Sequence, residues 1–122
     1  MSRINAGIPP KELTDKHLIA EHREIKRIPN IIKKGKLSGE GAPPKFTLGK
    51  GHIKFFYDKQ LYLLERYKIL YAECHRRGFN VQNYSTAWDG LPRMLMNNYT
   101  PTARDRKIVR ERIAERLEAM KK

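Results

Sequence analysis

Apolar side chains recur at helical spacing through residues 53–77, and this pattern constrains the fold more than any other feature of the chain. The stripe repeats every three, four or seven residues and comprises Phe56, Leu63, Tyr67, Leu70 and Cys74. A helix with such a stripe buries it against the rest of the protein. Gly78 follows at the position where a left-handed residue ends a helix. We therefore expect a central core helix over residues 53–77, whose aromatic side chains pack in the core.

A helix is also predicted over residues 14–35. Thr14 is a suitable N-cap, and Gly35 should end the helix. Pro29 should bend or interrupt it near its last third, because proline lacks the backbone N–H that continues a helix. Before it, residues 2–13 read as an extended arm that contains Pro9 and Pro10.

The third predicted helix begins after Pro101, where Thr102 and Asp105 form a cap. Its apolar stripe comprises Val109, Ile113, Leu117 and Met120. Residues 36–52 are rich in glycine and proline and should form a loop, and residues 79–99 are irregular with one short helix over 88–96. No segment alternates with period two. The sequence thus predicts an all-α fold, a single compact domain over residues 1–122 with three main helices and an extended N-terminal arm.

The chain is strongly basic. It has 26 Lys and Arg against 13 Asp and Glu, a net charge of +13 and a pI near 10.1. Such a charge is typical of a protein that binds a polyanion, so DNA or RNA is the leading partner, ahead of an anionic membrane surface. No apolar run is long enough for a signal peptide or a membrane span. We expect an intracellular, cytoplasmic monomer.

Cysteine and histidine usage argues against metal chemistry and disulfides. Cys74 is the single cysteine, so no intrachain disulfide can form, as is typical of a reducing compartment. The four histidines lack the spacing of a zinc site. We therefore expect no metal and no cofactor.

Glu24 has an unusual position on the first predicted helix. On a helical wheel it lies on the seam between an apolar face and a basic face, with His17 within about 20° of it. The apolar face holds Leu18, Ile25, Ile28 and Ile32, and the basic face holds Lys16, Arg23 and Arg27. Glu24 is a candidate catalytic carboxylate at the edge of a cationic groove. The simpler interpretation, an ion pair with Arg23 or Arg27, stays open, as does a purely structural role for His17.

The last predicted helix carries Arg112 and Arg116 four residues apart. Guanidinium groups at this spacing suit the recognition of phosphates. A solvated helix face is an equally good interpretation of the run alone. With the overall charge and the basic face of the first helix, the pattern favours a DNA groove shared by the two helices.

The first five residues, MSRIN, place a small residue after the start methionine. If Met1 is removed, Ser2 carries a free α-amine next to Arg3. Because an α-amine titrates at about 7.7–8.0, roughly a tenth of it is unprotonated and nucleophilic at neutral pH, and the charge of Arg3 lowers its pKa further. Such an amine can attack a sugar C1′ and form an imine, assisted by a nearby carboxylate. A small second residue is also common in chains where it has no function.

Several long segments together resemble one family. They are MSRIN, HLIAEHREIKRIP, FTLGKGHIKFFYDK, AECHRRGFN and NYTP. The combination is similar to the phage pyrimidine-dimer DNA glycosylase/AP lyase, endonuclease V of the denV type, over about residues 1–117. The resemblance implies a compact all-α domain that binds double-stranded DNA containing pyrimidine dimers or abasic sites. It implies cleavage of the glycosidic bond of the 5′ pyrimidine of a cyclobutane dimer, followed by β-elimination.

The resemblance also implies roles for individual residues. The amine nucleophile of the family corresponds to Ser2, and its essential carboxylate corresponds to Glu24. The residues that match its DNA-contacting positions are Arg3, His17, Arg23, Arg27, Arg112 and Arg116, the last of which is a lysine in the family.

The sequence departs from the family pattern at several positions. Lys16 replaces a glutamine, His22 a tyrosine and Lys26 a proline, and the sequence ends at Lys122 where the family continues into an aromatic, basic tail. The difference at the C-terminal end, the largest of these, predicts weaker dimer discrimination or affinity, or another lesion preference with the same mechanism. A non-catalytic DNA-binding module and an RNA-binding protein of ribosomal type are the alternatives from other classes.

Overall fold

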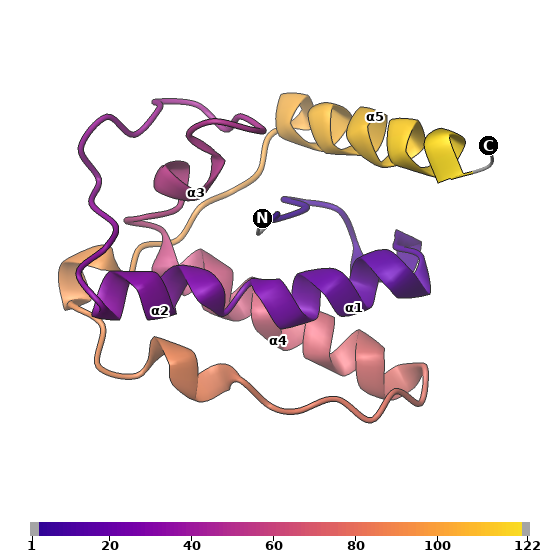
Figure 1. Ribbon diagram of the computed structural model, residues 1–122, viewed down its shortest axis with the longest axis horizontal. Coiled ribbons are helices and arrows are strands. Elements are labelled where there is room, and N and C mark those ends of the chain that lie inside the picture. Colours follow the sequence, from indigo (N-terminus) through magenta and orange to yellow (C-terminus); the bar gives the residue numbers. More distant parts are fainter. Residues whose placement is uncertain (1–2, 121–122) are drawn as a thin grey trace.

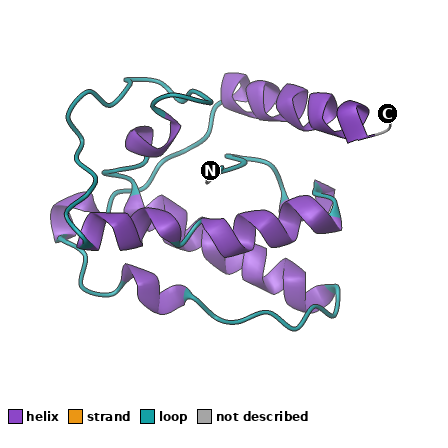
Figure 2. Cartoon of the chain, in the orientation of Figure 1, coloured by secondary structure: helices purple, strands orange, loops and turns teal. Residues whose placement is uncertain are grey.

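The computed structural model describes residues 3–120, and every regular element in that range is helical (Figures 1 and 2). The prediction of an all-α fold is confirmed. The elements in chain order are η1 (Pro10–Glu12), α1 (Asp15–Glu24), α2 (Arg27–Lys33), α3 (His52–Phe55), α4 (Gln60–Arg76), η2 (Ser85–Trp88), η3 (Arg93–Leu95) and α5 (Ala103–Met120). Helix α1 packs on α4, and the N-terminal arm runs between α1 and α5 (Figure 1). None of the helices in residues 3–120 is long and apolar enough to cross a membrane.

The first predicted helix is divided into α1 and α2. The predicted start and end are confirmed: Thr14 Oγ1 accepts a hydrogen bond from the His17 N–H at 3.2 Å, and Gly35 has φ of 69° after α2. The break falls at residues 25–26, about one turn before Pro29. Proline at position i removes the hydrogen bond to the carbonyl of residue i−4, which here belongs to Ile25. The effect of Pro29 is therefore seen one turn upstream of the proline itself.

The prediction of one continuous helix over residues 53–77 is wrong, because a turn at residues 56–59 separates α3 from α4. The side chain of Gln60 donates to the carbonyls of Phe56 at 2.8 Å and Tyr57 at 3.2 Å. In the turn the Phe56 carbonyl also accepts from the Lys59 N–H at 3.0 Å, in place of the Gln60 N–H that would pair with it in a continuous helix. Gly78, with φ of 82°, ends α4 as predicted.

The third predicted helix is confirmed as α5. Thr102 and Asp105 cap it reciprocally, with the Thr102 N–H donating to Asp105 Oδ2 at 3.0 Å and the Asp105 N–H to Thr102 Oγ1 at 3.1 Å. Only the first part of its apolar stripe is buried, since Val109 is in the core and Met120 is 54% exposed. The short helix predicted over 88–96 is replaced by the two 3₁₀ turns η2 and η3.

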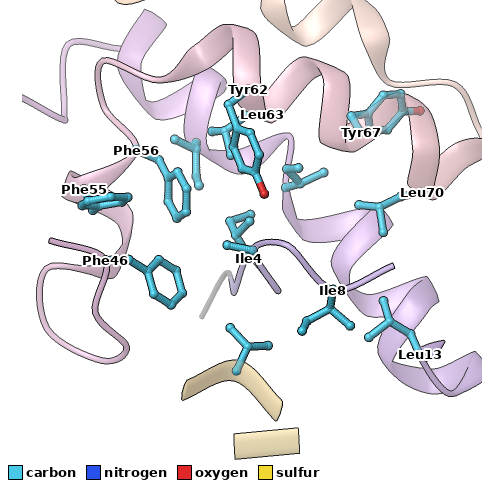
Figure 3. Close-up of a cluster of buried hydrophobic side chains, with 14 of the residues drawn as sticks. Ile4, Ile8, Leu13, Phe46, Phe55, Phe56, Tyr62, Leu63, Tyr67 and Leu70 are labelled. Carbon is cyan, nitrogen blue, oxygen red and sulfur yellow. The ribbon is translucent and has the colours of Figure 1, made fainter. Parts of the chain in front are cut away.

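The core lies where α1, α4 and the N-terminal arm meet (Figure 3). Leu18, Ile25 and Ile28 of the predicted apolar face are all fully buried. At one end of the core, Phe46, Phe55 and Phe56 pack edge to face with ring centroids 5.1–6.0 Å apart. Phe46 belongs to the segment predicted as loop, which therefore contributes to the core as well as connecting two helices.

A buried ion pair joins α1 to α4. Arg66 Nε lies 2.8 Å from Glu21 Oε2 and Arg66 Nη2 lies 2.9 Å from Glu21 Oε1, and the two side chains are 2% and 1% exposed. The remaining guanidinium nitrogen, Nη1, donates to the Ile8 carbonyl at 2.6 Å. The pair therefore binds both helices and the N-terminal arm together.

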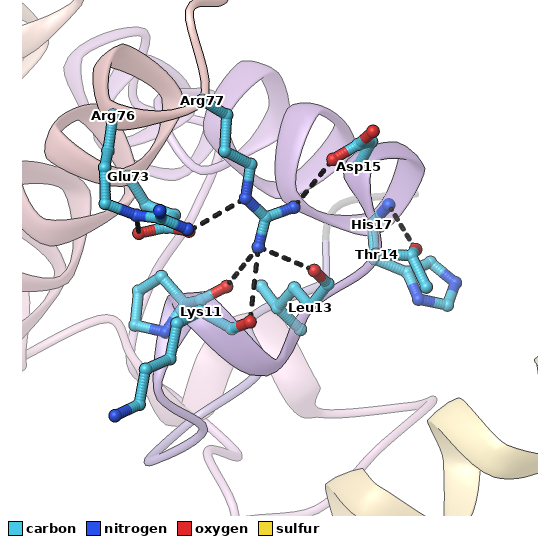
Figure 4. Close-up of polar contacts among 9 residues, drawn as sticks. Lys11, Leu13, Thr14, Asp15, His17, Glu73, Arg76 and Arg77 are labelled. Carbon is cyan, nitrogen blue, oxygen red and sulfur yellow. Dashed lines mark hydrogen bonds and ion pairs between the residues drawn. The ribbon is translucent and has the colours of Figure 1, made fainter.

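Arg77 holds the end of the arm against the end of α4 (Figure 4). Its guanidinium donates to the carbonyls of Pro10 at 3.1 Å and Leu13 at 2.8 Å and pairs with Asp15 at 2.8 Å. Its Nε also donates to Glu73 Oε2 at 2.8 Å. One side chain thus positions the turn η1 and the first turn of α1.

The buried pair makes a prediction about stability. The variant Arg66→Met leaves the Glu21 carboxylate buried without its cation, so the free energy of unfolding should fall by about 3–5 kcal/mol. Urea denaturation followed by circular dichroism measures the change. Lys68→Met on the same helix removes an exposed pair with Glu65 and should cost less than about 1 kcal/mol. Equal losses in the two variants would contradict the prediction.

Candidate functional site

A cleft of about 480 Å³ lies between the N-terminal arm, α1 and α5. The arm forms its floor, and the two helices form its walls. Its lining includes four cations, two glutamates and four small or apolar side chains, and it comprises Arg3, Asn5, Lys16, His17, Ala20, Glu21, Glu24, Arg112, Ile113, Arg116, Ala119 and Met120. A concave, positively charged surface of this kind binds a polyanion.

The cleft brings together five of the predicted site residues: Arg3, His17, Glu24, Arg112 and Arg116. They come from the arm, from α1 and from α5, so positions separated by more than a hundred residues converge. A groove shared by the basic faces of the first and last helices was predicted. Lys16, Arg112 and Arg116 of these faces line the cleft.

Two of the predicted residues that the structure describes are placed differently. Arg23 and Arg27 are exposed and do not line the cleft. Arg23 Nη2 lies 3.2 Å from Glu24 Oε2, so the ion pair that the sequence analysis left open is present. Because the Glu24 side chain is still 18% exposed and lines the cleft, the pair leaves its carboxylate accessible. Ser2 lies outside the described residues.

The cations in the cleft are close enough to repel one another. Burial lowers the pKa of Arg3, the charges of Arg112 and Arg116 lower it further, and Glu24 raises it. A cluster of like charges with so little compensation inside the cleft is stabilised when an anion binds. The phosphates of a nucleic acid meet this requirement, and arginine contacts them in bidentate geometry.

His17 lies on the α1 wall of the cleft. Burial lowers its pKa, and the positive charges of Arg116, Lys16 and Arg3 lower it further, so the imidazole is neutral at pH 7. Its buried Nδ1 and the buried Nε of Arg112 have no hydrogen-bond partner within residues 3–120.

Side chains from three helices hold the floor of the cleft. The Ile4 N–H donates to His52 Nε2 at 2.9 Å, and the Asn5 side chain donates to Glu21 Oε1 at 2.7 Å. The Gly7 N–H donates to the Tyr62 hydroxyl at 3.2 Å. Helices α1, α3 and α4 therefore hold the arm at Ile4, Asn5 and Gly7.

Asn5, Glu21, His52 and Arg66 were missed as site-building residues. A signal was present for two of them. Glu21 is three residues after Leu18 and four before Ile25, so it occupies the buried face of its helix. Arg66 is three residues after Leu63 and four before Leu70, on the buried stripe of α4. Opposite charges at buried positions of two helices indicate a pair.

No group of three or more His, Cys, Asp or Glu side chains within residues 3–120 is placed to hold a metal ion.

The all-α fold and the basic cleft between the arm, α1 and α5 are those of a protein that binds a polyanion, with an acidic group, Glu24, at the same surface. Comparison with known families identifies the class more closely, because the model of the pyrimidine dimer DNA glycosylase family matches residues 1–86 of the 122. The chain belongs to the pyrimidine dimer DNA glycosylase family and is a DNA repair glycosylase, with DNA as its substrate. The matched region contains the arm and helices α1–α4, and α5 with its two cleft arginines lies beyond it.

The electrostatics of the cleft can be tested directly. In Arg116→Met, the His17 pKa should rise toward its ordinary value of 6.5, because a positive charge that lowers it is removed. Titration of the histidine ring protons by NMR measures the pKa. Arg110→Met is the matched control, since Arg110 is on α5 but pairs with Glu12 at 3.0 Å outside the cleft. An unchanged His17 pKa in Arg116→Met would show that the two side chains do not face each other in solution.

Proposed function

We propose that the protein removes the 5′ pyrimidine of an ultraviolet-induced cyclobutane dimer and then cleaves the DNA backbone as an AP lyase. In the first step the α-amine of Ser2 attacks C1′ of the damaged nucleotide. The glycosidic bond breaks, the sugar ring opens, and an imine forms between the amine nitrogen and C1′. Removal of a C2′ proton then expels the 3′ phosphate by β-elimination. The amine exists only after Met1 has been removed.

The observation that supports this mechanism best is the convergence of the arm and Glu24 on one cleft. Arg3, the residue after the proposed nucleophile, lines the same cleft as Glu24 and His17. Glu24 assists ring opening and is our first choice for the base that removes the C2′ proton. His17 is the second choice, and its lowered pKa leaves the imidazole free to accept a proton at neutral pH.

DNA binding is assigned to the cations around the cleft. Arg3, Arg112 and Arg116 bind phosphates inside it, and Arg23 and Arg27 extend the binding surface along the exposed side of α1 and α2. Flipping a base out of the duplex costs least where pairing is already damaged, which contributes to lesion selectivity. Abasic sites, which need no base removal, are the second substrate.

The covalent step is tested by trapping. Sodium borohydride should link the protein to ultraviolet-irradiated duplex and to abasic duplex through the residue 2 nitrogen, because it reduces an imine to a stable amine. Peptide sequencing of the product locates the link. A protein that binds DNA without catalysis gives no adduct, and an RNA-binding protein shows no preference for irradiated DNA. Either result contradicts the proposal.

The role of Glu24 is tested by Glu24→Gln. Loss of the carboxylate should reduce the single-turnover cleavage rate by about 100-fold or more, as expected for a general acid–base group. Glu111→Gln is the matched control, because Glu111 is an exposed glutamate of α5 that pairs with Lys107 away from the cleft. Nicking of irradiated DNA by Glu24→Gln at the normal rate would show that another group is the base.

Phosphate binding is tested by salt dependence. Neutralising Arg112 and Arg116 together should weaken binding to undamaged duplex. It should also reduce the slope of log K against log salt by about one for each phosphate that the protein no longer neutralises. Fluorescence anisotropy at several salt concentrations measures the slope. Arg110→Met should leave the slope unchanged, and an unchanged slope in the double variant would place the phosphates elsewhere.

A further inference from the structure

His52 is a buried histidine whose protonation state is determined by its two partners. The side chain lies at the start of α3 and is 3% exposed. Its Nε2 is 2.9 Å from the Ile4 backbone N–H, which can only donate, so Nε2 must be the unprotonated acceptor. Its Nδ1 is 2.8 Å from the Thr47 carbonyl, which can only accept, so Nδ1 carries the hydrogen. His52 is therefore neutral and held in one tautomer.

The hydrogen bond from Ile4 differs from the other bonds of the arm in its position and in its acceptor. Three backbone N–H groups of the arm, those of Ile4, Asn5 and Gly7, donate to side chains of α3, α1 and α4 respectively. The Ile4 bond is the one nearest to residue 2 along the chain. Ile4 also follows Arg3, which lines the cleft. Of the three acceptors, the imidazole is the group whose charge changes between pH 5 and 8.

We propose that His52 is a positioning residue for the cleavage reaction: in its neutral form it holds Ile4 and thereby sets where the residue 2 amine and Arg3 meet the DNA. Protonation of Nε2 replaces the acceptor with a second donor facing the Ile4 N–H, so this hydrogen bond is lost and the arm loses its attachment to α3 at Ile4, while Glu21 and Tyr62 still hold Asn5 and Gly7. The inference rests on the proposed function, in which the α-amine of residue 2 is the nucleophile.

The surroundings of His52 set the direction of its pH response. Burial is the largest influence and lowers its pKa. The Thr47 carbonyl raises the pKa, the charge of Arg3 on the arm lowers it, and Glu21 on α1, paired with Arg66 of α4, raises it. The rings of Phe46 and Phe56 complete the enclosure. These influences together lower the pKa of His52 from the ordinary 6.5, so the neutral side chain holds the arm at neutral pH, and protonation sets in only as the pH falls through the lowered pKa.

Two substitutions separate the two hydrogen bonds of His52. The amide of His52→Asn reaches the position of Nδ1 and can bond to Thr47, but it does not reach Ile4. The amide oxygen of His52→Gln reaches the position of Nε2, so it accepts from Ile4 and does not protonate in this pH range. His22→Gln is the matched control, because His22 is equally buried, bonds to the Tyr67 hydroxyl at 3.2 Å and makes no hydrogen bond to the described part of the arm.

The first measurement is single-turnover cleavage of irradiated duplex at pH 7.5, together with the Kd for the same DNA. In His52→Asn the rate constant should fall about 100-fold while the Kd stays within about threefold, because a small displacement of a reacting group costs rate more than binding. His52→Gln should retain most of the wild-type rate. As the pH is lowered from 7.5 through the pKa of His52, its rate should fall less than that of the wild type, whereas His22→Gln should follow the wild type.

A second measurement does not depend on catalysis. Hydrogen exchange at the Ile4 amide, followed by NMR, should be slow in the wild type and in His52→Gln at pH 7.5 and fast in His52→Asn. If His52→Asn does not fold, the pH dependence of His52→Gln and its Ile4 exchange decide the matter. Wild-type rate and pH profile in both variants, or slow Ile4 exchange in His52→Asn, overturn the inference. Failure of borohydride trapping in the wild type would instead overturn the proposed function and leave the exchange result standing.

Discussion

The buried pair between Glu21 and Arg66 is the interaction on which the site most depends. Burying two charges is costly, and the cost is offset here because the two charged groups bond to each other twice and each also bonds to the arm. The Glu21 carboxylate accepts from Arg66 and from the Asn5 side chain, while Arg66 also donates to the Ile8 carbonyl. The pair thereby joins α1, α4 and two points of the N-terminal arm. Glu21, the α1 member of the pair, holds Asn5 of the arm in the lining of the cleft.

Helix α1 serves two surfaces through two glutamates separated by one turn. Glu21 points into the protein and pairs with a cation of the core, whereas Glu24 pairs with exposed Arg23 at the edge of the cleft. The same helix therefore holds the arm through Glu21 and places the Glu24 carboxylate in the cleft that the arm lines. The arrangement places an acidic group beside the cations Arg3, Arg112 and Arg116 of the cleft.

Capping residues and glycines predicted where the helices begin and end, but the apolar spacing did not predict the turn that divides α3 from α4. The caps at Thr14 and Thr102 and the stops at Gly35 and Gly78 were predicted correctly, because each acts on its immediate neighbours. The turn between α3 and α4 was not, because it depends on the Gln60 side chain bonding to backbone carbonyls. The periodicity of apolar residues continues across that turn, so the pattern alone could not reveal it.

By itself, the sequence determined the helical class, the cationic character, the family resemblance and the candidate residues, since all of these follow from residue types and their spacing. The tertiary structure decided which candidates meet. It placed Arg3, His17, Glu24, Arg112 and Arg116 around one cleft, kept Arg23 and Arg27 outside it, and made His52 a partner of Ile4 across 48 positions of the chain. Such contacts depend on how α1, α4, α5 and the arm pack together, and no local pattern carries that information.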